Sequence, residues 1–205
     1  MGNINLDSMD DIYYDVLREL GNIGAGNATT SLSVMLNRKM DMKVPKVVLV
    51  GFSELARIVG GEEEIVSALY LFLEGDIRGS MMFMLDDASA HSLVNGLMGK
   101  PMDVYEPFGE MELSALKEIG NIIVGSYLSA LSSLTNLTVI SSVPYLCSGD
   151  MAAAVLSIPA IEFGKIGDKA LLIETQFGDE LDINGYFLLI PELESYDVIL
   201  KSLGL

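Results

Sequence analysis

The chain has 205 residues, half of them hydrophobic, so it can bury a substantial core as one large domain or two small ones. Its 29 acidic and 12 basic residues give a formal net charge of −17, which repels nucleic acids and anionic lipid surfaces, so we expect neither as a partner. The longest apolar run, residues 65–73, is about half of what a membrane-spanning helix requires, and we expect no inserted segment.

Cysteine content and the start of the chain indicate the cellular compartment. The single cysteine, Cys147, cannot close a disulfide within the chain. The first residues include Asp7, Asp10 and Asp11 and lack the basic and then apolar pattern of a signal peptide. We therefore expect a cytoplasmic protein.

The first predicted element is a long amphipathic helix over residues 11–37. Apolar residues recur three and four positions apart, which is typical of one buried helix face. A polar stripe with the same spacing lies on another side of this helix and consists of Asp15, Glu19, Asn22 and Gly26.

Three apolar stretches and a short helix follow the long helix. The stretches span residues 43–50, 65–73 and 79–85 and are typical of β-strands. The short helix is predicted over residues 87–99, with a capping aspartate at its start and a glycine at its end.

The second half of the chain repeats this order. The Glu-x-x-Asn element of the first helix returns as Glu118 and Asn121, 99 positions later, within a predicted helix over about residues 111–134. Flanking positions keep their spacing as well, since Ser114 matches Asp15, Gly125 matches Gly26 and Pro144 matches Pro45. Strands are predicted over residues 151–159, 169–177 and 183–190, and a last helix over residues 195–204.

Self-similarity at a fixed separation indicates an internal duplication. Each half reads as helix, three strands and helix, which favours an α+β fold. Because an open solenoid needs about three or more repeats, we predict a single domain over residues 1–205 with pseudo-two-fold symmetry. Its halves are residues 11–99 and 110–204.

The repeated polar stripe contains the best candidates for function. Glu and Asn three positions apart lie on one side of a helix and can reach one target together. An asparagine amide donates and accepts hydrogen bonds without titrating, so it can orient a water molecule but cannot act as a general base. Polar residues on a helix are most often only a solvated surface. Here, however, the pair was retained in both halves while the strands diverged, which favours a functional role.

Glycines inside the first helix require an explanation, because each costs about 1 kcal/mol relative to alanine. Gly21 and Gly24 are open to two interpretations, close packing against the sheet or a functional role. Gly26 and Gly125 extend the polar stripe itself. For these two we expect that the backbone of another protein approaches closely.

The doubled pattern resembles the CheC family of phosphatases, which act on the response regulator CheY in chemotaxis, a two-component signalling system. This pattern is Asp or Ser, three residues, Glu, two residues, Asn, twenty-two residues and Pro. The resemblance implies a hydrolase that removes the aspartyl phosphate of CheY-P. It also implies that Asn22 and Asn121 position the attacking water, while Glu19 and Glu118 anchor the regulator through a lysine.

The same resemblance implies the partners and cofactors. Phosphorylated CheY is the expected substrate, and the receptor deamidase CheD is an expected second partner. No metal or cofactor of its own is expected, because the regulator brings magnesium. With two motifs in one chain we expect a monomer. The alternative is an adaptor that binds CheD, with weak or incidental catalysis and reciprocal linkage between the two partners.

Other candidate residues receive no chemical role. Asp15 and Ser114 flank the motif without an assigned function, and Pro45 and Pro144 are expected to end a connection and start a strand. The glycine-rich segment 21–27 does not follow a strand and lacks the G-K-[ST] sequence of a phosphate loop, so nucleotide binding is not expected. The remaining candidates, His91 and the methionines of residues 81–84, are assigned to the surface or to packing.

Overall fold

Both halves of the chain contain the same order of elements, apart from a short additional strand in the second half, in the computed structural model, which describes residues 11–37, 39–101, 105–163, 169–177 and 183–204. Asp7 and Asp10 lie outside these residues. The first half consists of α1 (Asp11–Met35), β1 (Met42–Gly51), α2 (Phe52–Ile58), β2 (Ile65–Gly75), β3 (Gly79–Asp86) and α3 (Asp87–Met98). The second consists of α4 (Glu110–Thr135), β4 (Val139–Ser141), β5 (Tyr145–Met151), α5 (Ala152–Phe163), β6 (Lys169–Phe177), β7 (Ile183–Pro191) and α6 (Leu193–Ser202).

The predicted strand over residues 151–159 is wrong, because this segment forms helix α5. Its buried residues Ala152, Val155, Leu156 and Pro159 recur at the three- and four-residue spacing of a helix. A short apolar run fits a strand and a buried helix equally well, and an internal proline usually argues against a helix. The strand of the second half that corresponds to β1 is β5. The helix of the first half that corresponds to α5 is α2, and this helix was not predicted either.

All strand pairs of the described chain are antiparallel and build one sheet in the order β1-β6-β7-β3-β2-β4, with β5 also paired to β2. The order is symmetric about the β3–β7 pair, in which Phe83 faces Phe187. Apart from the short β4, the first strand of each half joins the sheet beside the second strand of the other half, since β1 pairs with β6 and β5 pairs with β2. The predicted α+β duplication with pseudo-two-fold symmetry is therefore confirmed.

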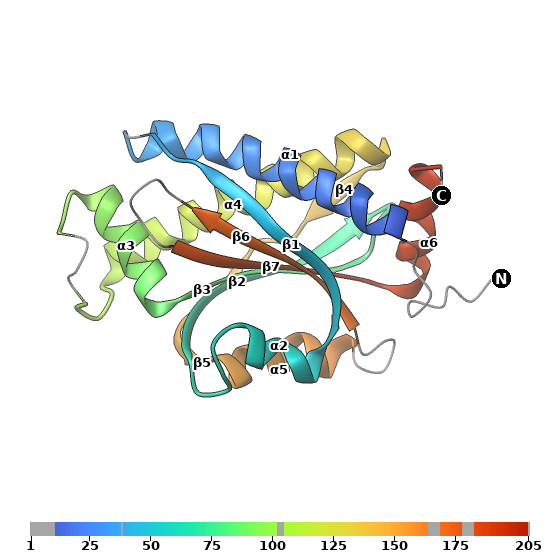
Figure 1. Ribbon diagram of the computed structural model, residues 1–205. Helices are drawn as coiled ribbons and strands as arrows, with labels where there is room; N and C mark the ends of the chain where they lie inside the picture. The colour runs from blue at the N-terminus through green and yellow to red at the C-terminus, as the bar shows by residue number, and fades with distance from the viewer. Residues whose placement is uncertain (1–10, 38, 102–104, 164–168, 178–182, 205) are drawn as a thin grey trace.

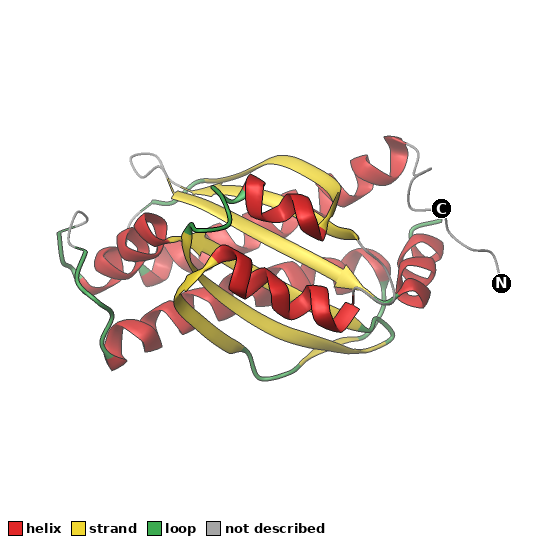
Figure 2. Cartoon of the chain, turned by 90° about the horizontal axis from the view of Figure 1, so that it is seen from below, coloured by secondary structure: helices red, strands yellow, loops and turns green. Residues whose placement is uncertain are grey.

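Helices cover both faces of the sheet (Figure 1). Alternating residues of β3 show the two faces, since Met81, Phe83 and Leu85 pack under α1 and α4, while Met82 and Met84 pack against α2 and α5. Figure 2 shows α2 and α5 crossing the lower face. The prediction that these methionines fill the core is confirmed, because all three are buried. Of the helices described, none is long and apolar enough to cross a membrane.

Helices α1 and α4 lie side by side and run in opposite directions on the upper face (Figure 1). They are in close contact where Gly24 of α1 meets Tyr127 of α4, so this glycine packs against the neighbouring helix rather than against the sheet. The Tyr127 ring is also stacked on Phe187 of β7, with 4.2 Å between ring centroids. A side chain at position 24 would therefore separate the two helices.

Both long helices end at an asparagine in the left-handed conformation, Asn37 after α1 and Asn136 after α4. These residues are also 99 positions apart. Asparagine tolerates this conformation better than most residues and commonly ends helices in this way. The duplication thus preserved the end of each helix together with its polar stripe.

We predict that Gly24→Ala destabilises the protein. The new Cβ would lie 2.7 Å from Cδ1 and 3.1 Å from the backbone Cα of Tyr127, so rotation of the ring alone cannot relieve the clash. Overpacking of this kind costs about 1–3 kcal/mol, which exceeds the gain of about 1 kcal/mol in helix propensity. The free energy of unfolding, measured by urea denaturation, should decrease.

Gly26→Ala is the matched control, because a Cβ at this position meets nothing within 4 Å. It should leave the free energy of unfolding unchanged or raise it. Equal stability of the two variants would contradict the close contact between α1 and α4.

Candidate functional site

The polar stripe of α1 faces solvent along its whole length. Asp15, Glu19, Asn22 and Gly26 are all exposed. The opposite side of the helix is anchored in the core, for example by Leu20. The Glu19 carboxylate and the Asn22 amide therefore point away from the sheet on the same side of the helix, where a partner protein can reach both.

The stripe of α4 has the same composition and a slightly different environment. Ser114, Glu118 and Gly125 are exposed, whereas Asn121 is half-buried. The Ser114 hydroxyl donates a hydrogen bond to the Glu110 carbonyl within the helix, at 2.9 Å. The structure thus presents a second Glu and Asn pair, with less freedom for the asparagine than in α1.

The two Glu and Asn pairs form two separate sites. Because the helices are antiparallel, the pairs lie on opposite sides of the contact between Gly24 and Tyr127. At 1.5 Å per residue, the pairs are roughly 15 Å apart along the helix direction. Each site therefore has one carboxylate and one amide of its own, and no composite site joins the two helices.

A cation precedes the glutamate in both copies, Arg18 in α1 and Lys117 in α4. Arg18 forms an exposed ion pair with Asp15, with 3.0 Å between Nη1 and Oδ1. In the second copy Ser114 replaces the aspartate, so this intrahelical pair is not repeated. Both cations lie within the repeated segments, R-E-L-G-N at residues 18–22 and K-E-I-G-N at residues 117–121, but outside the polar stripe, and no role was predicted for them.

The two motif prolines lie at different places relative to their strands. Pro144 directly precedes β5, as predicted. Pro45 lies inside β1, between Lys43 and Lys46, where the pairing with β6 shifts register. An edge strand tolerates a proline at such an irregularity because the missing N–H faces away from the partner strand. The prediction that Pro45 starts a strand is therefore wrong. Pro45 is part of the sheet, and its role is still structural rather than chemical.

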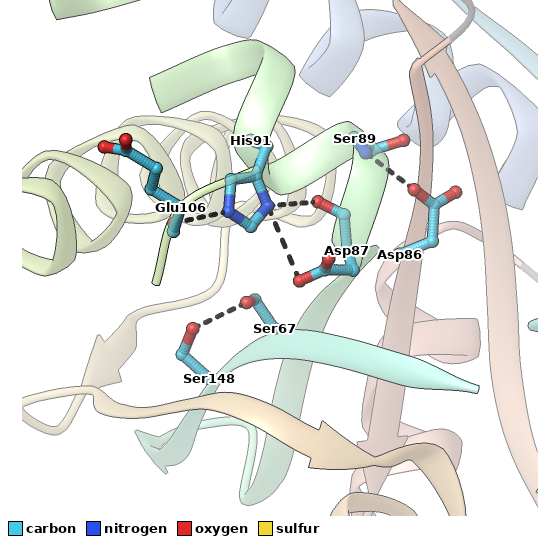
Figure 3. A network of polar contacts seen from close by, with 7 residues as sticks. All are labelled: Ser67, Asp86, Asp87, Ser89, His91, Glu106 and Ser148. Atoms are coloured by element: carbon cyan, nitrogen blue, oxygen red, sulfur yellow. Dashed lines mark hydrogen bonds and ion pairs between the residues drawn. The ribbon is translucent and has the colours of Figure 1, made fainter. Parts of the chain in front are cut away.

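His91 has a packing role, as the sequence indicated. Its ring is buried, and its two nitrogens lie 2.9 Å from the Asp87 carbonyl and 3.0 Å from the Glu106 carbonyl (Figure 3). It also stacks on Phe108 with 4.2 Å between centroids. His91 thus ties α3 to the segment that leads into α4.

In the part of the chain that the structure describes, the remaining reactive side chains offer no alternative centre. Cys147 is half-buried in β5, and burial together with nearby Asp150 raises the pKa of its thiol, which disfavours the nucleophilic thiolate. The capping prediction for Asp86 is confirmed, since its carboxylate accepts a hydrogen bond from the Ser89 amide (Figure 3). Within the described ranges, no group of three His, Cys, Asp or Glu side chains could hold a metal ion.

Comparisons with known proteins agree with this geometry. The model of the CheC-like family matches residues 14–49 and 111–146, and each segment contains one Glu and Asn pair and its proline. The CheY-P phosphatase CheC of Bacillus subtilis is 38% identical over 195 residues, which cover 93% of each chain.

Two solved structures with the same fold overlap with most of this chain. The Thermotoga maritima FliY structure has a TM-score of 0.75 at 22% identity and covers 95% of this chain and 99% of its own. The CheX–CheY–BeF3–Mg²⁺ complex of Borrelia burgdorferi has a TM-score of 0.51 at 19% identity, covering 82% of this chain and 96% of the matched chain. From the doubled motif, the shared fold and the 38% identity over nearly the whole length, the chain belongs to the CheC-like family.

Proposed function

We propose that this protein is a phosphatase that hydrolyses the aspartyl phosphate of a chemotaxis response regulator, CheY-P. The observation that carries the proposal is the duplicated Glu and Asn pair on two adjacent helices, in which both glutamates and Asn22 are exposed and Asn121 is half-buried. The name of the Bacillus subtilis relative, a CheY-P phosphatase, supports the same reaction. We place the reaction in the cytoplasm and take the monomer as its unit, since one chain already has both sites.

Asn22 and Asn121 would position the attacking water. The amide oxygen of each can accept a hydrogen bond from the water, and the amide nitrogen can donate to a phosphoryl oxygen. The water oxygen then forms a bond to phosphorus as the bond from phosphorus to the aspartyl oxygen breaks, giving inorganic phosphate, a free aspartate carboxylate and one proton. Phosphoryl transfer depends mainly on such positioning and on charge stabilisation, so a neutral amide is sufficient.

Glu19 and Glu118 would anchor the regulator. An exposed carboxylate one turn before the asparagine can form a charge-assisted hydrogen bond with a lysine of the partner. Such a pair fixes the rotation and the register of the partner along the helix. The magnesium ion would come with the regulator, and its presence in the solved CheX–CheY complex supports this source.

Replacement of the two asparagines tests the mechanism. Asn22→Ala and Asn121→Ala each remove one water-positioning amide, and the double variant should lose at least about a hundredfold of the acceleration, in line with the loss of one preorganised polar group. The decay of phosphorylated CheY, measured with magnesium present, gives the rate for each variant.

Asn22 is exposed and Asn121 is only half-buried, so the variants should unfold at about the same denaturant concentration as the wild type. Loss of rate in only one single variant would identify the dominant site. A double variant with the full wild-type rate would rule out the mechanism.

A second candidate function is an adaptor that binds CheD. The observation that favours it is four exposed apolar side chains, which belong to β5, to the residues just before it, and to α5, a helix on the sheet face opposite α1 and α4. They are Val143, Tyr145, Met151 and Ile161, which are 51–77% exposed. Exposed large apolar side chains of this kind often mark a protein interface.

Ile161→Asp tests the adaptor function, because a charge at this exposed position would oppose an apolar contact. Affinity for CheD, measured by calorimetry, should fall by tenfold or more, while the rate of CheY-P decay should not change. An unchanged CheD affinity would exclude this part of α5 as the contact. No binding of CheD by the wild-type protein would exclude the adaptor function.

A further inference from the structure

The helices that bear the two sites contain five glycines in their interiors, and contacts within the chain explain three of them. A Cβ at Gly21 would lie 3.1 Å from the Val44 side chain, and one at Gly24 would clash with Tyr127. A Cβ at Gly120 would lie 2.9 Å from the Leu69 side chain. These three positions are glycine because the helices pack closely against the sheet or against each other.

Gly26 and Gly125 have no such explanation. Both are exposed, and a Cβ at either position would meet nothing within 4 Å. Neither has a positive φ, so an L-residue fits the backbone at both positions. Glycine is the poorest helix former apart from proline, so these two residues weaken their helices without any benefit to packing.

Their location relates them to the two sites. Gly26 follows Asn22 by four residues and Gly125 follows Asn121 by four residues, so each lies on the same side of its helix, one turn further along. The two glycines are themselves at equivalent positions of the duplication. A protein that brings its phosphoryl group to the asparagine must therefore pass over, or lie beside, this turn.

We propose that Gly26 and Gly125 are specificity-determining positions, at which the main chain of the docked regulator rests directly on the helix backbone. Contact with a partner side chain would leave room for a methyl group through a different rotamer. Contact with a partner main chain leaves no such freedom, and glycine is the usual residue where two backbones approach closely. The inference rests on the proposed function and specifies what each site recognises, namely a main-chain segment of the regulator.

A side chain at either glycine would change the distance between the asparagine amide and the phosphoryl group of the regulator. A methyl group at the glycine would lift the regulator away from the helix by about 1 Å or more, and a displacement of this size can cost about a hundredfold in rate. The same methyl group would improve the helix itself. Activity and stability should therefore change in opposite directions, which a merely structural glycine would not allow.

The test uses variants in which one site works alone. Gly26→Ala is introduced into the Asn121→Ala protein, whose α1 site is intact, and Gly125→Ala into the Asn22→Ala protein. We expect kcat/KM for phosphorylated CheY to fall by tenfold to a hundredfold in each, with a Tm equal to or above that of the parent. Binding of CheY activated with beryllofluoride and magnesium, followed by fluorescence, should weaken in parallel.

Two controls separate the glycine from general effects. Ser31→Ala in the Asn121→Ala protein changes an exposed residue of α1 five positions beyond Gly26, on another side of the helix, and should not change kcat/KM. Gly26→Ala in the Asn22→Ala protein should add no loss, since the α1 site is already inactive and the α4 site does not involve this residue.

Each outcome decides between the two proposals. If the wild type accelerates decay and the glycine variants keep the parental kcat/KM, the role of the glycines is wrong and the phosphatase function stands. A fall in kcat/KM that is accompanied by a fall in Tm would also overturn the role of the glycines in docking, because the glycines would then be structural. If the wild type neither binds activated CheY nor accelerates decay, the phosphatase function fails and the inference fails with it.

Discussion

The pairing of β3 with β7 is the constraint on which the rest of the structure depends. It joins the two halves at the centre of the sheet, with Phe83 opposite Phe187. Because each half also gives its first strand to the other half, neither half completes its sheet alone. The antiparallel register then places α1 and α4 next to each other on one face, where their apolar sides share a single core.

This packing determines which side of each helix remains available for function. One side of α1 is occupied by the sheet and another by α4, with Gly24 and Tyr127 in close contact. The polar stripe is what remains, and it points outward on both helices. The duplication therefore creates two sites of the same chemistry. Their neighbours differ, since Asn22 is exposed and Asn121 half-buried.

The sequence predicted the duplication, the two long helices and the polar stripes correctly, because helical spacing and fixed-period repetition depend on local residues alone. It failed where local patterns are ambiguous. Residues 151–159 were predicted as a strand from their apolar run, yet residues 152–159 belong to α5, with Pro159 inside the helix. The exchange of first strands between the halves had no local signature. The need for glycine at position 24 could not be predicted either, because Tyr127 is far from Gly24 in the sequence and contacts it only in the folded structure.

In the proposed reaction, a division of labour between the two proteins would explain how so acidic a chain acts on a phosphoryl group. With a net charge of −17 and with Arg18 paired to Asp15, the α1 site brings little positive charge to the reaction. In the proposed reaction the regulator supplies that charge through its magnesium ion and lysine. A carboxylate base would repel the phosphoryl group, whereas a neutral amide adds no repulsion. What this chain contributes is a fixed geometry, and a helix packed against a sheet and a second helix holds an asparagine more rigidly than a loop would.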